Sequence, residues 1–217
     1  MRIFIKINTQ SMVKADYQGS EGKEKITIPS YLIRDIIDGV PYYYKGYKDV
    51  LNKTKTREDI MPCSTLQAEI IMYLNFLLTQ ALGLKKYRIF TGESGNHLAK
   101  NINYGLDLAV YDRTILTSEK INKHYANVPP ELVVEVDIRV ELEDLNEIEF
   151  INKKTQSLLD YGTKKVIWVV SESQKVLIAE SDAEKDWLLR DWHKDFDLFQ
   201  GVNANIGQYF KEQDIQL

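Results

Sequence analysis

Apolar residues recur at helical spacing in two long segments of the chain. The first segment, residues 64–83, begins at Ser64 or Thr65 as a capping residue, carries isoleucine and leucine on one face, and ends at Gly83. The second segment, residues 141–162, has a sparser apolar stripe, which is formed by Leu145, Ile148, Ile151, Leu158 and Leu159. Both patterns predict amphipathic helices with one buried face.

Start and stop signals predict two shorter helices. Residues 30–39 open with a serine that suits an N-cap and close at Gly39, and residues 203–213 predict a helix near the end of the chain. The polar stretches 51–59 and 94–103 have no such periodicity and are predicted loops.

Apolar or alternating runs between these segments predict strands. They cover residues 2–8, 25–30, 85–93, 104–112, 129–137, 164–170, 176–180, 187–192 and 197–201. The run 164–170 is nearly continuous in apolar side chains, as is typical of a strand at the centre of a sheet. The order of elements predicts an α/β fold with a central mixed sheet and a helix on each side. We divide the chain into an N-terminal strand-and-loop extension, residues 1–29, and one domain, residues 30–217.

Acidic residues interrupt the apolar strand 129–137. Strand side chains alternate between faces, so Val133, Glu135 and Asp137 share one face, and the other face is formed by Leu132, Val134, Val136 and Ile138. A buried carboxylate costs on the order of several kcal/mol unless it is paired, hydrated or bound to a metal. The strand therefore predicts a partner for Glu135.

A second acid and a lysine are candidates for the same site. Asp107 lies inside the strand 104–112, where we expect Leu106, Leu108 and Val110 to occupy the opposite face. In the helix 141–162 the apolar stripe is centred near Thr155. Lys153 lies roughly 150° from that centre and Lys154 roughly 110°, at the margin of the buried face. Lys154 is therefore the lysine that is able to reach a strand carboxylate.

Two strand acids and a lysine suit metal-dependent hydrolysis of phosphodiesters. Carboxylate oxygens bind Mg²⁺ or Mn²⁺ in an octahedral shell that keeps several waters, and the backbone carbonyl of Val136 is a further candidate ligand. Such a metal polarises the phosphate and activates a bound water, while the lysine offsets negative charge. Glu69, in the first turns of a helix, is either an additional metal ligand or an acid that favourably meets the helix dipole.

Simpler interpretations remain open for each of these residues. Glu135 and Lys154 also suit a structural ion pair, with Arg139 as a second partner for the acid, and Asp107 also suits an acid near a strand end. A carboxylate pair can also perform acid–base hydrolysis without a metal.

Composition and net charge argue against several classes of protein. The net charge is −4 and the isoelectric point is near 5.5, which argues against a protein that coats nucleic acid non-specifically. No apolar run reaches the length of a membrane span, the first residues lack a signal-peptide pattern, and the one cysteine, Cys63, cannot form an intramolecular disulfide. We therefore expect a cytoplasmic protein without a membrane partner.

Several sequence segments follow one another in a characteristic order along the chain. GLDLAVYD and PPELVVEVD are followed by a helix with a lysine eight residues before a glycine, then by KKVIWVV and a hairpin. DGVPYYY (38–44) and MPCSTLQAEIIMYLNFLL (61–78) precede them. In this order, the segments resemble the Uma-type restriction endonucleases, which belong to the PD-(D/E)XK nuclease superfamily. Residues 38–44 look like the early hairpin of that family, and residues 61–78 look like its first long helix.

The resemblance implies a restriction-endonuclease-like domain, Mg²⁺ or Mn²⁺ as cofactor, DNA as substrate and a homodimer as an expected assembly. It makes Asp107 the acid of the PD motif, Glu135 the second acid, and Lys154 a motif lysine that has moved to the following helix. Several positions depart from the pattern. Leu106 stands for the proline and Asp137 for the usual strand lysine, DIRVELEDLNE replaces the usual serine-proline stretch, and Gln67 and Glu69 lie where the family often has a histidine. The altered lysine region and the acidic charge leave open an inactive binding or regulatory protein on the same scaffold.

Overall fold

A computed structural model describes residues 28–138, 141, 147–182 and 187–216 of the chain. The predicted strand 2–8 and half of the predicted strand 25–30 lie outside these residues, as does most of the proposed extension 1–29.

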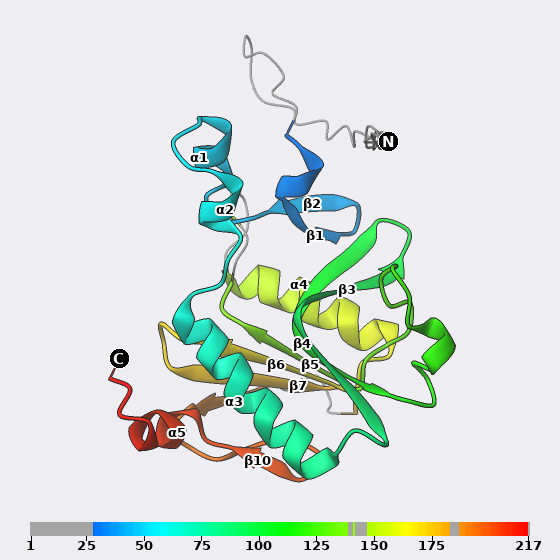
Figure 1. The fold of residues 1–217 in the computed structure, drawn as a ribbon, viewed down its shortest axis with the longest axis vertical. Coiled ribbons are helices and arrows are strands. Elements are labelled where there is room, and N and C mark those ends of the chain that lie inside the picture. Colours follow the sequence, from blue (N-terminus) through cyan, green and yellow to red (C-terminus); the bar gives the residue numbers. More distant parts are fainter. Residues whose placement is uncertain (1–27, 139–140, 142–146, 183–186, 217) are drawn as a thin grey trace, which may run out of the picture.

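An eight-stranded mixed sheet forms the centre of the fold (Figure 1). Its strands are β1 (Ile33–Ile37), β2 (Val40–Tyr43), β3 (Tyr87–Ala99), β4 (Ile102–Asp112), β5 (Leu132–Val136), β6 (Lys165–Val170), β7 (Lys175–Glu180) and β8 (Leu188–Asp191). The strand order is β2-β1-β4-β5-β6-β7-β8, and β3 pairs with β4 beside this path. β5 and β6 are parallel, whereas the other paired strands are antiparallel. A smaller sheet pairs β9 (Phe196–Phe199) with β10 (Val202–Ala204).

Three longer helices cover the central sheet. They are α3 (Thr65–Leu82), α4 (Glu147–Tyr161) and α5 (Ile206–Glu212). The remaining helical turns are η1 (Ser30–Leu32), α1 (Tyr47–Leu51), α2 (Arg57–Ile60) and η2 (Ser118–Lys120). None of the described helices is long and apolar enough to cross a membrane.

The two faces of the sheet pack against different helices. One core layer joins α3 and α5 to the sheet and includes Ile70, Leu74, Leu78, Leu132, Val134, Val136, Ile206 and Phe210. The other layer joins α4 to the sheet and includes Val133, Phe150, Ile151, Leu158, Val166 and Trp168. Neighbouring β5 residues thus enter opposite layers, as the alternation along this strand predicts. The predicted α/β fold with helices on both sides of a mixed sheet is confirmed.

The predicted short helix over residues 30–39 is wrong. Apart from the single turn η1, the segment forms the hairpin β1–β2. Asp38 and Gly39 connect its strands with φ angles of 52° and 79°, the left-handed conformation that two-residue hairpin turns require. β-branched isoleucines on β1 favour the strand as well.

Both predicted loops contain regular structure. Most of the stretch 94–103 continues β3 and begins β4, so the turn between these strands is short and includes Asn101 at a φ of 65°. The stretch 51–59 contains the end of α1 and the start of α2, whose N-terminus is stabilised by a capping box at Thr56. Both stretches are polar and lack apolar periodicity, so these elements were not predicted from the sequence.

The buried face of α4 is rotated from its predicted position. Phe150 is fully buried, whereas Ile148 is 72% exposed and lies about 90° from the centre of the observed face. Including Phe150 moves the centre of the face toward Lys154, which lies inside the buried face and not at its margin. Lys153 is exposed, as predicted.

Candidate active site

The site lies where β4 changes its neighbour within the sheet. β3 pairs along one edge of β4. On the other edge, β1 pairs at Asn103 and β5 begins to pair at Leu108. Asp107 lies between these two positions, at the fork where β1 and β5 separate.

The strand alternation expected around Asp107 is broken. Leu108 and Val110 enter the core layer beneath α3, but Leu106 enters the layer beneath α4. The β3 strand opposite this point carries a register shift between Thr91 and Ser94. Such bulges bend the strand pair locally and re-aim side chains, which explains the difference from simple alternation.

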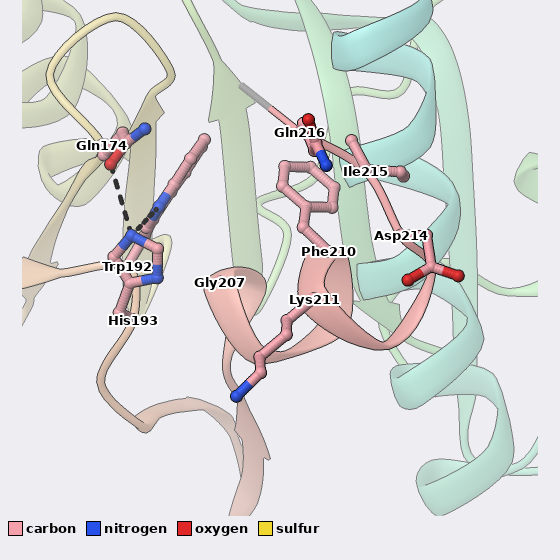
Figure 2. Close-up of a pocket in the computed structure, with 9 residues that line it drawn as sticks. All are labelled: Gln174, Trp192, His193, Gly207, Phe210, Lys211, Asp214, Ile215 and Gln216. Carbon is pink, nitrogen blue, oxygen red and sulfur yellow. Dashed lines mark hydrogen bonds between the residues drawn. The ribbon is translucent and has the colours of Figure 1, made fainter.

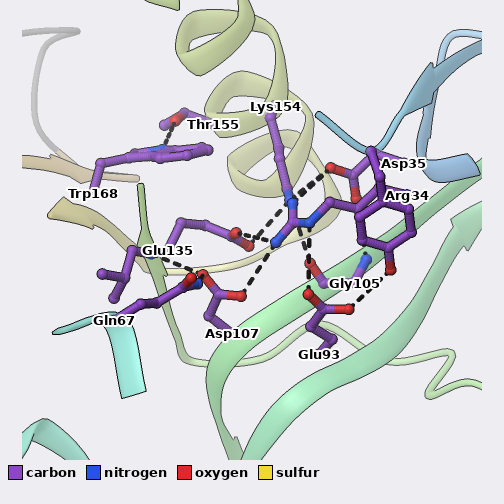
Figure 3. Close-up of polar contacts among 12 residues, drawn as sticks. Arg34, Asp35, Gln67, Glu93, Gly105, Asp107, Glu135, Lys154, Thr155 and Trp168 are labelled. Carbon is purple, nitrogen blue, oxygen red and sulfur yellow. Dashed lines mark hydrogen bonds and ion pairs between the residues drawn. The ribbon is translucent and has the colours of Figure 1, made fainter. Parts of the chain in front are cut away.

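Asp107 is buried and held by three donors from different elements. Its Oδ2 accepts hydrogen bonds from the Val136 backbone amide at 2.9 Å and from Gln67 Nε2 at 3.1 Å. Its Oδ1 accepts from Arg34 Nη2 at 3.2 Å. The acid therefore joins β5, α3 and β1 at one point (Figure 3).

Glu135 faces two cations from the end of β5. Its Oε1 lies 3.2 Å from Lys154 Nζ, and its Oε2 lies 3.5 Å from Arg34 Nη2. Neither carboxylate oxygen has a hydrogen-bond partner among the described residues. Burial raises the pKa of Glu135 to about 7, although the charge of Lys154 acts in the opposite direction.

Lys154 is fully enclosed between acids and aromatic rings. Its Nζ donates to Asp35 Oδ2 at 3.1 Å, in addition to its ion pair with Glu135. The ammonium lies 5.2 Å from the ring centre of Tyr104 and 5.9 Å from that of Trp168, distances at which cation–π attraction operates. The ammonium also donates to the Gly105 carbonyl at 3.4 Å, so contacts from β1, β4 and β5 hold it in place.

Two of the charged residues at the site, Arg34 and Asp35, were not predicted from the sequence. Asp35 accepts hydrogen bonds from Arg34 Nη1 at 3.1 Å and from the Gly105 amide at 3.1 Å. Burial disfavours the charged guanidinium, but the surrounding carboxylates outweigh burial and raise the pKa of Arg34. Charged residues inside the apolar run LIRDII are the same signal that identified Glu135, and the predicted helix obscured it.

The charges at the site do not balance. Arg34 and Lys154 face three buried carboxylates, those of Asp35, Asp107 and Glu135, so one negative charge is in excess once all three are ionised, and the raised pKa of Glu135 delays that ionisation to about pH 7. A buried cluster of this kind favours an additional or more highly charged cation.

The two strand acids fit a small divalent metal. Within the described residues, no three histidine, cysteine or acidic side chains converge as a complete metal site. Mg²⁺ is commonly bound by only one or two carboxylates together with waters, however, so Asp107 and Glu135 satisfy its usual protein contribution. The oxygens of Glu135, which accept no hydrogen bond from the described residues and lie beside a second acid, are the observation that fits a metal. The contribution of the Val136 carbonyl remains a prediction, whereas its amide already contacts Asp107.

Glu69 and Asp137 make contacts away from these acids. Glu69 accepts a hydrogen bond from Tyr209 Oη at 2.5 Å, which directs its carboxylate toward α5. Gln67, about 200° away on the helix, is the α3 residue that reaches Asp107. Asp137 accepts hydrogen bonds from the amide and hydroxyl of Ser171 just beyond β5.

The site is closed in this structure. The side chains of Arg34 and Asp107 are 1% exposed, and those of Glu135 and Lys154 are fully buried. The pocket in Figure 2 lies between α5 and the segment around Trp192 and contains none of these residues. Access to the acids therefore requires a neighbouring element to move.

The sequence matches no protein-family model. It also matches no curated protein. Among solved structures, the chain is similar to a putative nuclease belonging to DUF820 from Anabaena variabilis ATCC 29413. The TM-score is 0.56 and the sequence identity is 15%, over 82% of this chain and 89% of the other. The two proteins therefore share a nuclease-like α/β fold.

Proposed function

We propose that the protein is a metal-dependent endonuclease that hydrolyses phosphodiester bonds of DNA. The convergence of Asp107, Glu135 and Lys154 on a nuclease-like fold supports this function. The choice of DNA, and of the Uma-type family, follows from the sequence resemblance together with the nuclease named for the similar structure.

Asp107 and Glu135 would hold Mg²⁺ or Mn²⁺, with the Val136 carbonyl as a third protein ligand. When bound, the cation supplies polarisation of the phosphate and a water of lowered pKa. The Val136 amide and Gln67 fix the orientation of the Asp107 carboxylate, because both donate to the same oxygen.

Lys154 would offset the negative charge that develops on the phosphate. Its ammonium is held beside Glu135 by Asp35 and two aromatic rings, so it is already oriented before substrate binds. Asp35 is a positioning residue in this account, since it contacts both Lys154 and Arg34.

The buried carboxylate of Glu135, which has ion pairs but no hydrogen bond among the described residues, is the single observation that carries the proposal. A permanent structural acid at full burial is expected to accept hydrogen bonds, yet neither oxygen does so within the described part of the chain. Its two contacts are ion pairs with long side chains. Such an acid suits a metal ligand, because a bound cation would supply the contacts that its two oxygens lack.

Cleavage of supercoiled plasmid DNA tests the function. Wild-type protein should nick the plasmid in Mg²⁺ or Mn²⁺ and fail to do so in EDTA. The isosteric variant Glu135→Gln should be inactive in either metal, while the matched variant Glu131→Gln, on the segment before β5, should retain activity. Cleavage that persists in EDTA or in Glu135→Gln would refute the metal mechanism.

A catalytically inactive DNA-binding or regulatory protein is the second candidate. The full burial of both acids and the position of Arg34 between them favour it. DNA binding by wild-type protein without cleavage in either metal would support this function over hydrolysis.

A further inference from the structure

We propose that Arg34 is a resident cation that occupies the position between Asp107 and Glu135 and must leave for a divalent metal to bind both acids. The inference rests on the proposed function, because it concerns access to the same metal site. Arg34 would thereby hold the site closed in the metal-free protein.

Arg34 bridges the two acids through a single nitrogen. Its Nη2 lies 3.2 Å from Asp107 Oδ1 and 3.5 Å from Glu135 Oε2. Of the cationic side chains in the described ranges, it alone contacts both acids, since Lys154 pairs with Glu135 and Asp35. A metal shared by these carboxylates would compete for the same space and charge.

The charge at the site favours such an exchange. With Arg34 in place, two positive charges face three buried carboxylates. A divalent ion in place of the guanidinium would balance the three carboxylates together with Lys154. Exchange therefore allows all three buried carboxylates to be ionised with their charge balanced.

Arg34 is incompletely satisfied in its present position. Its Nε is buried and has no hydrogen-bond partner in the part of the chain that the structure describes. The same nitrogen lies 3.9 Å from Oε1 of Glu93, whose side chain is 25% exposed. Glu93 accepts a hydrogen bond from Tyr44 Oη at its other oxygen, Oε2, at 2.9 Å, and its Oε1, closer to solvent, would retain the guanidinium after it leaves the two acids.

The strand that carries Arg34 joins β4 through a short backbone ladder. β1 pairs with β4 at one position, Ile36 with Asn103. Its register with β2 is irregular between Ile33 and Asp35, which places Arg34 at the irregularity. A strand with so short a ladder opens locally at lower cost than the central strands.

Calorimetric titration with Mn²⁺ tests the proposal against a matched arginine. Arg34→Gln should bind Mn²⁺ at least about tenfold more tightly than wild type, because the competing cation is gone. Arg190→Gln, on the exposed part of β8, should bind like wild type. Equal affinity of Arg34→Gln and wild type would overturn the role of Arg34 and leave the proposed metal site intact. Absence of binding in both proteins would instead refute the proposed function.

A measurement on wild-type protein covers the case in which Arg34→Gln does not fold. The guanidinium resonances of Arg34, assigned by their loss in Arg34→Lys, should shift when diamagnetic Mg²⁺ is added. Mg²⁺ binding, measured by calorimetry, without a change in these resonances would overturn the proposal. A shift that saturates together with Mg²⁺ binding would support displacement of the Arg34 side chain. It would separate this displacement from an effect that the charge of Arg34 has on Mg²⁺ affinity alone.

Discussion

The Lys154 ammonium lies 3.2 Å from Glu135 Oε1, and both side chains are fully buried. The pair connects α4 to the end of β5, across the core layer that also contains Phe150 and Trp168. Removing one member of a buried pair leaves an uncompensated charge, which commonly destabilises a protein by about 3–5 kcal/mol. The pair therefore contributes to stability as well as to the proposed chemistry.

Replacing Lys154 should separate metal binding from cleavage. Lys154→Met should still bind Mn²⁺ through Asp107 and Glu135 but lose plasmid cleavage, because the ammonium is absent at the phosphate. Urea unfolding should show a loss of about 3 kcal/mol in stability for this variant. The adjacent control, Lys153→Met, removes an exposed lysine and should preserve both activity and stability. Normal cleavage by folded Lys154→Met would refute the role assigned to Lys154.

Gln67 and Glu69, two nearby residues of α3, should differ in their effect on Mn²⁺ affinity. Gln67→Leu removes the donor to Asp107 and should weaken Mn²⁺ binding by about tenfold, as loss of a supporting hydrogen bond commonly does. Glu69→Gln alters only the contact with Tyr209 and should leave Mn²⁺ affinity unchanged. Calorimetry of both variants distinguishes these roles. A weaker affinity in Glu69→Gln would place that acid in the metal shell.

The stability of the metal-free protein should depend on the protonation of Glu135. Burial raises the pKa of Glu135 from 4.5 to about 7, so between these values the folded protein keeps a proton that the unfolded chain has released. The free energy of unfolding should therefore fall as pH rises through this window, by about 3 kcal/mol at most. Mn²⁺ affinity should rise over the same window, because the metal requires the carboxylate.

Urea unfolding in EDTA, at about pH 5 and about pH 8, measures this dependence. Glu135→Gln cannot ionise, so its stability should decrease less than that of wild type between the two values. Parallel changes in the two proteins would show that another group causes the pH dependence.

Local periodicity explains why part of the site was predictable. Glu135 was identified from alternation along one strand, and Lys154 from its angle on one helix. Both are properties of a single element, and the structure places the two side chains in contact. The long helix 64–83 was predictable for the same reason, with Ser64 as the observed N-cap.

Contacts between distant elements explain most of what was missed. Arg34 and Asp107 are 73 positions apart, and they meet only because β1 and β5 share one edge of β4. No local pattern encodes that fork. The Asp38–Gly39 turn was a readable signal for the β1 hairpin, and the serine cap with the closing glycine outweighed it in the sequence analysis.

Calorimetric titration of Mn²⁺ into wild type and Asp107→Asn tests the central claim most directly. The asparagine retains an oxygen for the Val136 amide, so the strand contact is expected to persist without the negative charge. Asp112→Asn, near the end of the same strand, controls for the loss of an acid away from the site. We predict saturable Mn²⁺ binding by wild type and Asp112→Asn and its loss in folded Asp107→Asn. Equal binding by all three proteins, or binding by none, would contradict a metal site at Asp107 and Glu135.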